Sequence, residues 1–419
     1  MKTYSKKGII WLFALVYFTS YFARKDFAAV TAGILESGFI TKDIAGLIGT
    51  AMFAMYGIGQ VISGILGDKF SPKALILTGL ATTCVCNILM PLIPIPELMI
   101  PVWGINGLAQ AMLWPPIVRV LAQFLNHDEY VKGNLIVTSA AHISTILLYL
   151  YAPLCLIIFN WKAVFISAGI LAAAVFVIFI IALSIVLPKE VRNTPPIAPQ
   201  NGKNGNSIAP TNENFAKLLL RAGVFPIFGA IIMMGYLRDG IESWLPTLYA
   251  EAFNRDASES ILISVVLPIF SIIAVMLTTR LHKKLFKNET FGASVVFVIS
   301  LVLCVPLYFL LGSSSPAGRI ICLLLAALIC GCMHACNFLY ISCLPGRFAS
   351  HGHASGATGV CNACTYIGAA ISTYGMASIS VAWGWSMNIV FWGIISALGL
   401  LCSAFAYKRY TAFTKEENY

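Results

Sequence analysis

Long apolar runs recur from one end of the 419-residue chain to the other. A helix of about 20 residues crosses the roughly 30 Å hydrocarbon core of a membrane and satisfies its own backbone hydrogen bonds there. The composition agrees, since 59% of the residues are hydrophobic and 11% are charged, unlike the balance in soluble domains. The sequence therefore predicts an all-α membrane protein with twelve transmembrane helices, placed to within roughly 2 to 4 residues at 9–34, 44–66, 74–93, 98–121, 134–158, 163–187, 219–248, 260–280, 290–311, 318–342, 355–379 and 385–407.

One polar stretch interrupts this pattern in the middle of the chain. Residues 188–217 are rich in Pro, Asn, Gly and Ser, which is typical of a flexible cytoplasmic linker. The stretch separates six predicted helices in 1–187 from six in 218–419. Two six-helix halves with polar insertions in the first and seventh helices are typical of a transporter built from two repeats, which binds its substrate between the halves.

The distribution of basic residues predicts the orientation. About 20 of the 27 Lys and Arg fall in segments on the side of the termini, and about four fall on the opposite side. The positive-inside rule therefore predicts that both termini lie in the cytoplasm, and we expect the membrane to be a bacterial inner membrane. The net charge of +10 reflects this topology and does not indicate a nucleic-acid partner. The charged start leads into a span too long for a signal-peptide core, so we expect the first helix to stay in the mature protein.

Two arginines lie inside apolar runs, Arg24 in the first and Arg238 in the seventh. A cation in the hydrocarbon core costs roughly 2.5 to 3.5 kcal/mol or more, so such residues normally face the bundle interior or a watery cavity. Tyr17, Tyr21 and Arg24 are spaced to share one helix face with Lys25 beside it, and this donor set suits an oxyanion. A structural ion pair with an acid is the alternative for both arginines. For Arg238, Glu242 is spaced to be that acid, since it lies four residues further along the same helix.

Two further helices carry polar faces. In the fifth predicted helix, His142 shares a face with Thr138, Ser139 and Thr145, and a histidine there can become a cationic donor when an anion binds. A packing role for His142 remains equally open. The tenth helix places Cys330, His334 and Asn337 at helical spacing, and we expect them to meet the organic part of a ligand. We expect the cysteines of the spans to serve packing, with no metal site and no disulfides.

The loop after the second helix carries a glycine, an acid and then basic residues: Gly64, Asp68, Lys69 and Lys73. It resembles the signature loop of the major facilitator superfamily. Such a loop can act as a conformational latch, because the acid accepts hydrogen bonds from a neighbouring helix end in one state and releases them in the other. An ordinary basic loop is the alternative.

Several motifs together resemble the organophosphate:phosphate antiporters of that superfamily. They are YFARKDF at 21–27, the WPP of 114–116 with Arg119, the AAH of 140–142 and the R-x-G-I-x-x-W of 238–244. The resemblance implies that Arg24 and Arg238 bind the phosphoryl group, that His142 assists, and that four tyrosines line the pocket: Tyr17, Tyr21, Tyr56 and Tyr366. The chain departs from the glycerol-3-phosphate members at Gln60, Gly235, Ser243 and Cys330. The phosphate-binding residues are therefore kept while the organic pocket differs, and either Asp239 or Glu242 is left to pair with Lys25.

The sequence accordingly predicts a monomeric secondary transporter that exchanges an organic phosphate ester for inorganic phosphate by alternating access. No G-x-x-x-x-G-K-S/T loop and no catalytic constellation occur, so we expect neither an enzyme nor a cofactor. Two alternatives share the same features: a sugar-phosphate sensor of the same fold, and a proton-coupled carrier of carboxylates. A drug efflux pump is disfavoured, because it would require an acid in the membrane rather than paired arginines.

Overall fold

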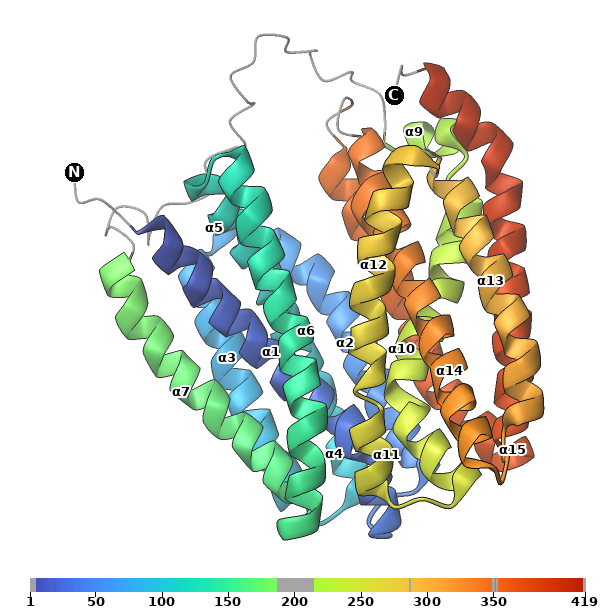
Figure 1. The fold of residues 1–419 in the computed structure, drawn as a ribbon. Coiled ribbons are helices and arrows are strands. Elements are labelled where there is room, and N and C mark those ends of the chain that lie inside the picture. Colours follow the sequence, from blue (N-terminus) through green and yellow to red (C-terminus); the bar gives the residue numbers. More distant parts are fainter. Residues whose placement is uncertain (1–4, 187–214, 286–287, 349–350, 352, 417–419) are drawn as a thin grey trace. The chain divides into compact units, whose positions relative to one another are not determined.

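The computed structural model describes residues 5–186, 215–285, 288–348, 351 and 353–416. Within these ranges the regular structure is entirely helical, as predicted (Figure 1). The chain forms two compact units. The first contains Met1–Gln200 together with Asp256–Val265, and the second contains Asn201–Arg255 together with Val266–Tyr419.

The first unit is built from seven long or medium helices and one short helix from later in the chain: α1 (Lys6–Glu36), α2 (Lys42–Lys69), α3 (Pro72–Leu89), α4 (Met99–Ala111), α5 (Trp114–Phe124), α6 (His127–Ile158), α7 (Lys162–Val186) and α11 (Ala257–Ile263). Helix α11 packs against α1 and α6. The segment 256–265, expected in the second half of the chain, therefore packs with the first unit. The predicted boundary at 187/188 lies outside the described residues, and the one at 217/218 falls within α9 and remains a prediction.

The second unit contains α9 (Phe215–Ala222), α10 (Phe225–Phe253), α12 (Val266–Lys284), α13 (Glu289–Leu310), α14 (Pro316–Asn337) and α15 (Ala354–Glu416). Helix α9 begins inside the stretch expected to be a linker. Helix α14 continues into the π-helical turn η3 (Phe338–Cys343) and the 3₁₀ turn η4 (Leu344–Phe348). The 63 residues of α15 are broken at Gly384, whose φ of 79° requires a glycine.

Eight of the described helical segments are long and apolar enough to cross a membrane. The number is nine if α9 and α10, bent by 83° at their junction, count as one span. Three features explain the difference from twelve. Helix α1 carries charged residues in its middle, the predicted span 98–121 is broken between α4 and α5 ahead of Pro115 and Pro116, and α15 joins the last two predicted spans across Gly384.

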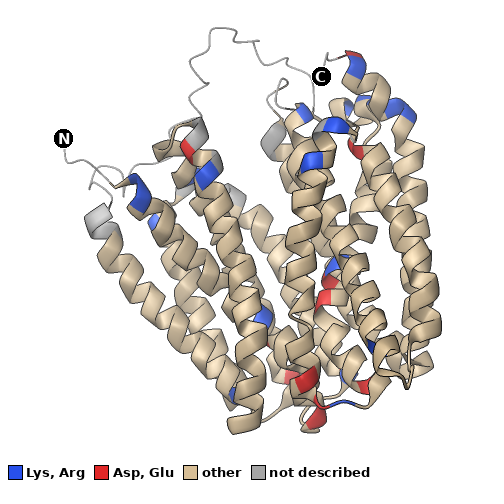
Figure 2. Ribbon diagram, viewed as in Figure 1, with Lys and Arg blue, Asp and Glu red and all other residues tan. Residues whose placement is uncertain are grey.

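Charged residues gather near the helix ends, and few lie in mid-helix (Figure 2). Polar caps define several of these ends. Asn126 and Glu129 form a capping box at the start of α6, and Lys6 at the start of α1 forms an ion pair with Glu129 at 2.8 Å. The hydrogen bond from Lys6 lowers the pKa of Glu129. This contact joins the ends of two neighbouring helices of the first unit.

A buried polar network fixes α1 within the first unit. The side-chain amides of Asn87 in α3 and Asn106 in α4 both donate to the carbonyl oxygen of Ala23, each at 3.1 Å. The Gln110 carbonyl oxygen accepts from Ser20, and its amide donates to Thr83. Because amides buried in a membrane protein must be satisfied internally, these bonds define the position of α1 one residue before Arg24.

In the second unit, glycines bring α10 and α15 into close backbone contact. A methyl group at Gly235 would collide with the carbonyl oxygen of Thr365, and one at Gly368 would collide with the carbonyl oxygen of Ile232. Small residues allow membrane helices to approach closely in this way. The indole N–H of Trp244 also donates to the carbonyl oxygen of Thr373 at 3.0 Å. Gly235, one of the positions where the chain departs from the glycerol-3-phosphate members, therefore has a packing role.

The Gly368 contact leads to a test of this helix pair. Gly368→Ala should lower the free energy of unfolding by about 1–3 kcal/mol, because the added methyl group forces α10 and α15 apart. Gly359→Ala in the same helix is the matched control, since an added methyl group has no atom within 4 Å. Thermal unfolding of the purified proteins measures the difference. Equal midpoints for the two variants would contradict the close contact.

Candidate functional site

In the first unit, Arg24 lies against tyrosine rings. Its guanidinium carbon is 4.2 Å from the ring centre of Tyr21 in α1 and 5.0 Å from that of Tyr56 in α2. Tyr17 is buried beside them, with its ring centre 5.0 Å from Tyr21 and 4.6 Å from Trp114. The aromatic faces attract the cation and offset part of its desolvation. The structure thus groups Tyr17, Tyr21, Tyr56 and Arg24 as the sequence predicted, while their role as ligands stays a prediction.

The two residues after Arg24 are both buried, Lys25 at 8% exposed and Asp26 at 0%. The Asp26 carboxylate accepts a hydrogen bond from the backbone N–H of Phe27 at 2.8 Å. Lys25 and Asp26 are therefore held inside the first unit, while Arg24 is partly buried. Whether Lys25 contacts a substrate remains a prediction.

His142 lies partly buried on α6. The preceding residue, Ala141, belongs to the same buried core as Tyr17, and Ser144 donates to the carbonyl oxygen of Phe18 at 2.7 Å. These contacts place this turn of α6 against the turn of α1 that carries the tyrosines. The hydroxyls of Thr138 and Thr145 donate to carbonyl oxygens of α6 itself, at 2.8 and 3.0 Å. They therefore contribute less to a polar face around His142 than the sequence suggested.

In the second unit, Arg238 is held by two side chains. Its Nη1 donates to Oδ1 of Asn337 in α14, and its Nη2 donates to Oδ2 of Asp239, each at 2.6 Å. The Arg238 and Asp239 side chains are only 12% and 6% exposed. Asp239, the next residue in the chain, therefore forms an ion pair with Arg238, and Glu242 also attracts the guanidinium electrostatically. Tyr366 in α15 also interacts electrostatically with Arg238, while its role in a binding pocket stays a prediction.

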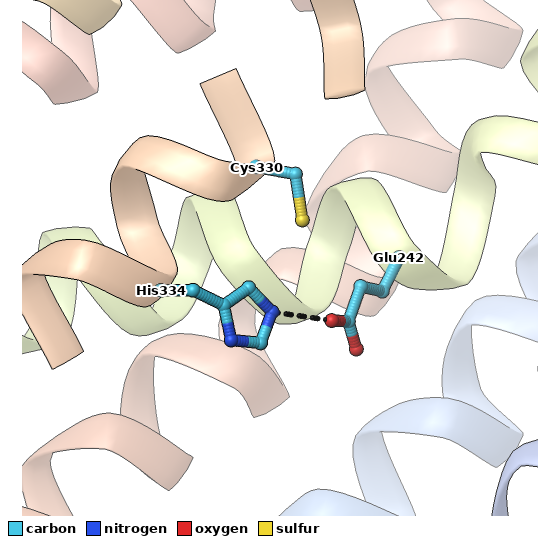
Figure 3. Close-up of side chains that lie close together, drawn as sticks. All are labelled: Glu242, Cys330 and His334. Atoms are coloured by element: carbon cyan, nitrogen blue, oxygen red, sulfur yellow. Dashed lines mark hydrogen bonds and ion pairs between the residues drawn. The ribbon is translucent and has the colours of Figure 1, made fainter. Parts of the chain in front are cut away.

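Glu242 pairs instead with His334. The imidazole Nε2 of His334 lies 2.6 Å from Oε1 of Glu242, and both side chains are slightly exposed, at 15% and 17%. The Cys330 thiol donates to the carbonyl oxygen of Arg238 at 3.9 Å. Figure 3 shows Cys330 and His334 of α14 pointing toward Glu242 of α10. The predicted stripe Cys330, His334 and Asn337 therefore faces α10, whereas contact with an organic ligand stays a prediction.

Most of the predicted latch lies outside the described side chains, namely Gly64, Asp68 and Lys69. Lys73 is described and is partly buried, two residues after Ser71, which caps α3 by accepting from the backbone N–H of Ala74 at 3.2 Å. The latch therefore remains a prediction.

Sequence reasoning missed two features around these residues. The first is the amide network of Asn87, Asn106 and Gln110, for which the signal was amide side chains within apolar runs. The second is the choice of partners in the second unit, where Arg238 takes Asp239 and Glu242 takes His334. Spacing along α10 could not reveal the contacts of Arg238 with Asn337 and of Glu242 with His334, because Asn337 and His334 come from α14.

The cation–π contact of Arg24 can be tested through stability. Without phosphate, Tyr21→Leu should lower the free energy of unfolding by about 0.5–2 kcal/mol, because the ring face beside the guanidinium is lost. Tyr21→Phe keeps that face and should lose less. Tyr374, which is 42% exposed in α15, provides the control pair of Leu and Phe variants. If Tyr21→Phe destabilised the protein as much as Tyr21→Leu, the hydroxyl rather than the ring would hold Arg24.

Two known proteins resemble this chain in sequence, and one solved structure resembles it in fold. The glycerol-3-phosphate transporter of Bacillus subtilis is 27% identical over 353 residues, covering 81% of this chain and 78% of the relative. The membrane sensor protein UhpC of Escherichia coli is 23% identical, covering 94% and 90%. A bacterial homolog of the human lysosomal transporter Spinster, solved in an inward-facing and unoccupied conformation, has a TM-score of 0.75 at 11% identity and covers 99% of both chains.

The structural likeness shows the fold, and the sequence relatives confirm the resemblance to the organophosphate:phosphate antiporters drawn from the motifs. The prediction of a multi-pass membrane protein is also confirmed. Residues 12–341 match the Major Facilitator Superfamily, whose signature the loop after the second helix resembles. The chain belongs to the Major Facilitator Superfamily.

Proposed function

We propose that this protein is a transporter that exchanges an organic phosphate ester for inorganic phosphate in the bacterial inner membrane, with both termini in the cytoplasm. One observation carries the proposal: each unit keeps an arginine inside a membrane helix, Arg24 against tyrosine rings and Arg238 against Asn337 and Asp239. Guanidinium groups match phosphate oxygens with paired donors, so Arg24 and Arg238 bind the phosphoryl group. The relative from Bacillus subtilis, a glycerol-3-phosphate transporter, supports this class of substrate.

The contacts of Arg238 are compatible with anion binding. Its hydrogen bonds to Asn337 and Asp239 use two of the five guanidinium N–H donors, which leaves donors for a phosphate oxygen. Asp239 neutralises the guanidinium while no anion is bound, and a phosphate dianion competes with it. On this mechanism, Arg238 exchanges a carboxylate partner for a phosphate partner.

Exchange follows from differential stabilisation. Two unit charges about 4 Å apart interact by roughly 4 kcal/mol at an effective dielectric of 20, so a cationic site resists closure unless it holds an anion. The loaded carrier then changes conformation more readily than the empty one. Outward movement of phosphate with inward movement of an ester therefore requires no ATP. His142, Lys25, Tyr17 and Tyr366 complete the proposed binding residues.

A sensor of phosphate esters is the second candidate. It is favoured by the membrane sensor relative, which matches 94% of this chain. A sensor would bind the same ligands through the same arginines but would not move them at a useful rate. Measured transport separates the two functions.

Counterflow in proteoliposomes tests the proposal. Vesicles loaded with labelled phosphate should release the label when external phosphate or a phosphate ester is added, and not when a carboxylate is added. Failure of every phosphate compound to release label from folded protein would reject exchange. Ligand binding without release would instead support the sensor.

Arginine substitutions test the site within the same assay. Arg24→Lys and Arg238→Lys should each slow phosphate exchange at least about tenfold, because losing one charge-assisted hydrogen bond costs about 1.5–3 kcal/mol. Lysine retains the charge but lacks the planar pair of donors. Arg319→Lys, at the start of α14, is the control and should exchange at the wild-type rate. Near-normal exchange by either test variant removes that arginine from the site.

A further inference from the structure

Three chemically different side chains meet in the second unit beside Arg238. They are the Cys330 thiol, the His334 imidazole and the Glu242 carboxylate, and one donor atom from each lies within 4.8 Å of the other two (Figure 3). Two of them come from successive turns of α14 and the third from the facing turn of α10. A sulfur, a nitrogen and an oxygen donor thus converge on one point.

We propose that Cys330, His334 and Glu242 form a binding site for a zinc ion. Zinc takes Cys, His and Glu ligands in tetrahedral geometry, and sites with three protein ligands leave a fourth position for water or a ligand oxygen. Hard cations such as Mg²⁺ and Ca²⁺ prefer all-oxygen sites, so the thiol selects against them. The proposal of a zinc site does not depend on whether the protein exchanges phosphate.

The distances require only local adjustment. Zinc bonds of about 2.0–2.3 Å in a tetrahedron place neighbouring ligand atoms about 3.3–3.6 Å apart. The Nε2 to Oε1 distance of 2.6 Å must therefore lengthen by somewhat less than 1 Å, and the sulfur, now within 4.8 Å, must move inward. Rotation about side-chain bonds can supply shifts of this size, since Glu242 and His334 both have several rotatable bonds.

The charges and the exposure of these three side chains also fit a zinc ion. A thiolate and a carboxylate balance the two charges of zinc when His334 is neutral, so the loaded site carries no net charge, as burial in a membrane protein favours. Binding releases the Cys330 proton to solvent, and the sulfur lone pair forms the metal bond. Cys330 is fully buried, while His334 and Glu242 remain 15% and 17% exposed and so give the ion an approach.

The rival explanation is that His334 only neutralises Glu242. That explanation accounts for the 2.6 Å contact between His334 and Glu242 and gives Cys330 no role in it. The two explanations differ in what happens when zinc is added to the protein. They also differ in whether the thiol is needed.

Zinc titration of the purified full-length protein in a phosphate-free buffer tests the site. Isothermal titration calorimetry should show one zinc ion per chain, and X-ray absorption at the zinc edge should show one sulfur among nitrogen and oxygen neighbours at about 2.3 Å. Cys330→Ser and His334→Gln should each weaken binding at least about tenfold, since even outer partners of metal ligands are worth 10- to 100-fold.

Cys332→Ser is the matched control, because Cys332 lies on the same helix and is partly buried but is not in the cluster. It should bind zinc like the wild type. Thermal unfolding checks that each variant is folded, and Cys330→Ala serves if Cys330→Ser is not. Absence of stoichiometric binding, absence of a sulfur neighbour, or equal losses in Cys330→Ser and Cys332→Ser would overturn the zinc site and leave an ion pair. Counterflow is unaffected by such a result, so the proposed exchange is judged separately.

Discussion

The central constraint on this protein is the free energy of holding a guanidinium group inside a membrane-spanning helix. The two units meet it with different chemistry. Arg24 lies over the faces of Tyr21 and Tyr56, which attract a cation without neutralising its charge. Arg238 is neutralised by Asp239 and hydrogen-bonded by Asn337. In the second arrangement a carboxylate balances the charge, and an incoming anion must displace it.

Both arrangements depend on helix contacts that surround the arginines without touching them. In the first unit, Asn87 and Asn106 bind the carbonyl oxygen of Ala23, next to Arg24 in the chain. In the second unit, Gly235 and Gly368 let α10 approach α15 within backbone contact, three residues before Arg238. No hydrophobic force drives helices together in a membrane interior. Buried amides and small residues therefore supply the hydrogen bonds and the close packing that hold the helices together. Buried amides in the first unit and close glycine contacts in the second therefore hold the helices that carry Arg24 and Arg238.

Helix α14 serves two purposes along one face. Asn337 binds Arg238, and one turn earlier His334 binds Glu242, so the face satisfies a cation and an anion on successive turns of α10. Cys330 extends the face to the carbonyl oxygen of Arg238. A zinc ion at Cys330, His334 and Glu242 would take Glu242 out of the electrostatic environment of Arg238 and leave Asp239 as its paired acid. Metal binding and anion binding would then share one helix interface, though each rests on its own residues.

The sequence by itself determined the membrane class, the all-helical fold, the family resemblance and the two arginines within apolar helices, because hydropathy and the cost of intramembrane charge act locally along the chain. Helical spacing also determined that Tyr17, Tyr21 and Arg24 share a face, and that Cys330, His334 and Asn337 do. Only the tertiary structure decided which charges pair. Asp239 forms the ion pair with Arg238, and Glu242 lies against His334 of α14, because packing between helices distant in sequence follows no local period.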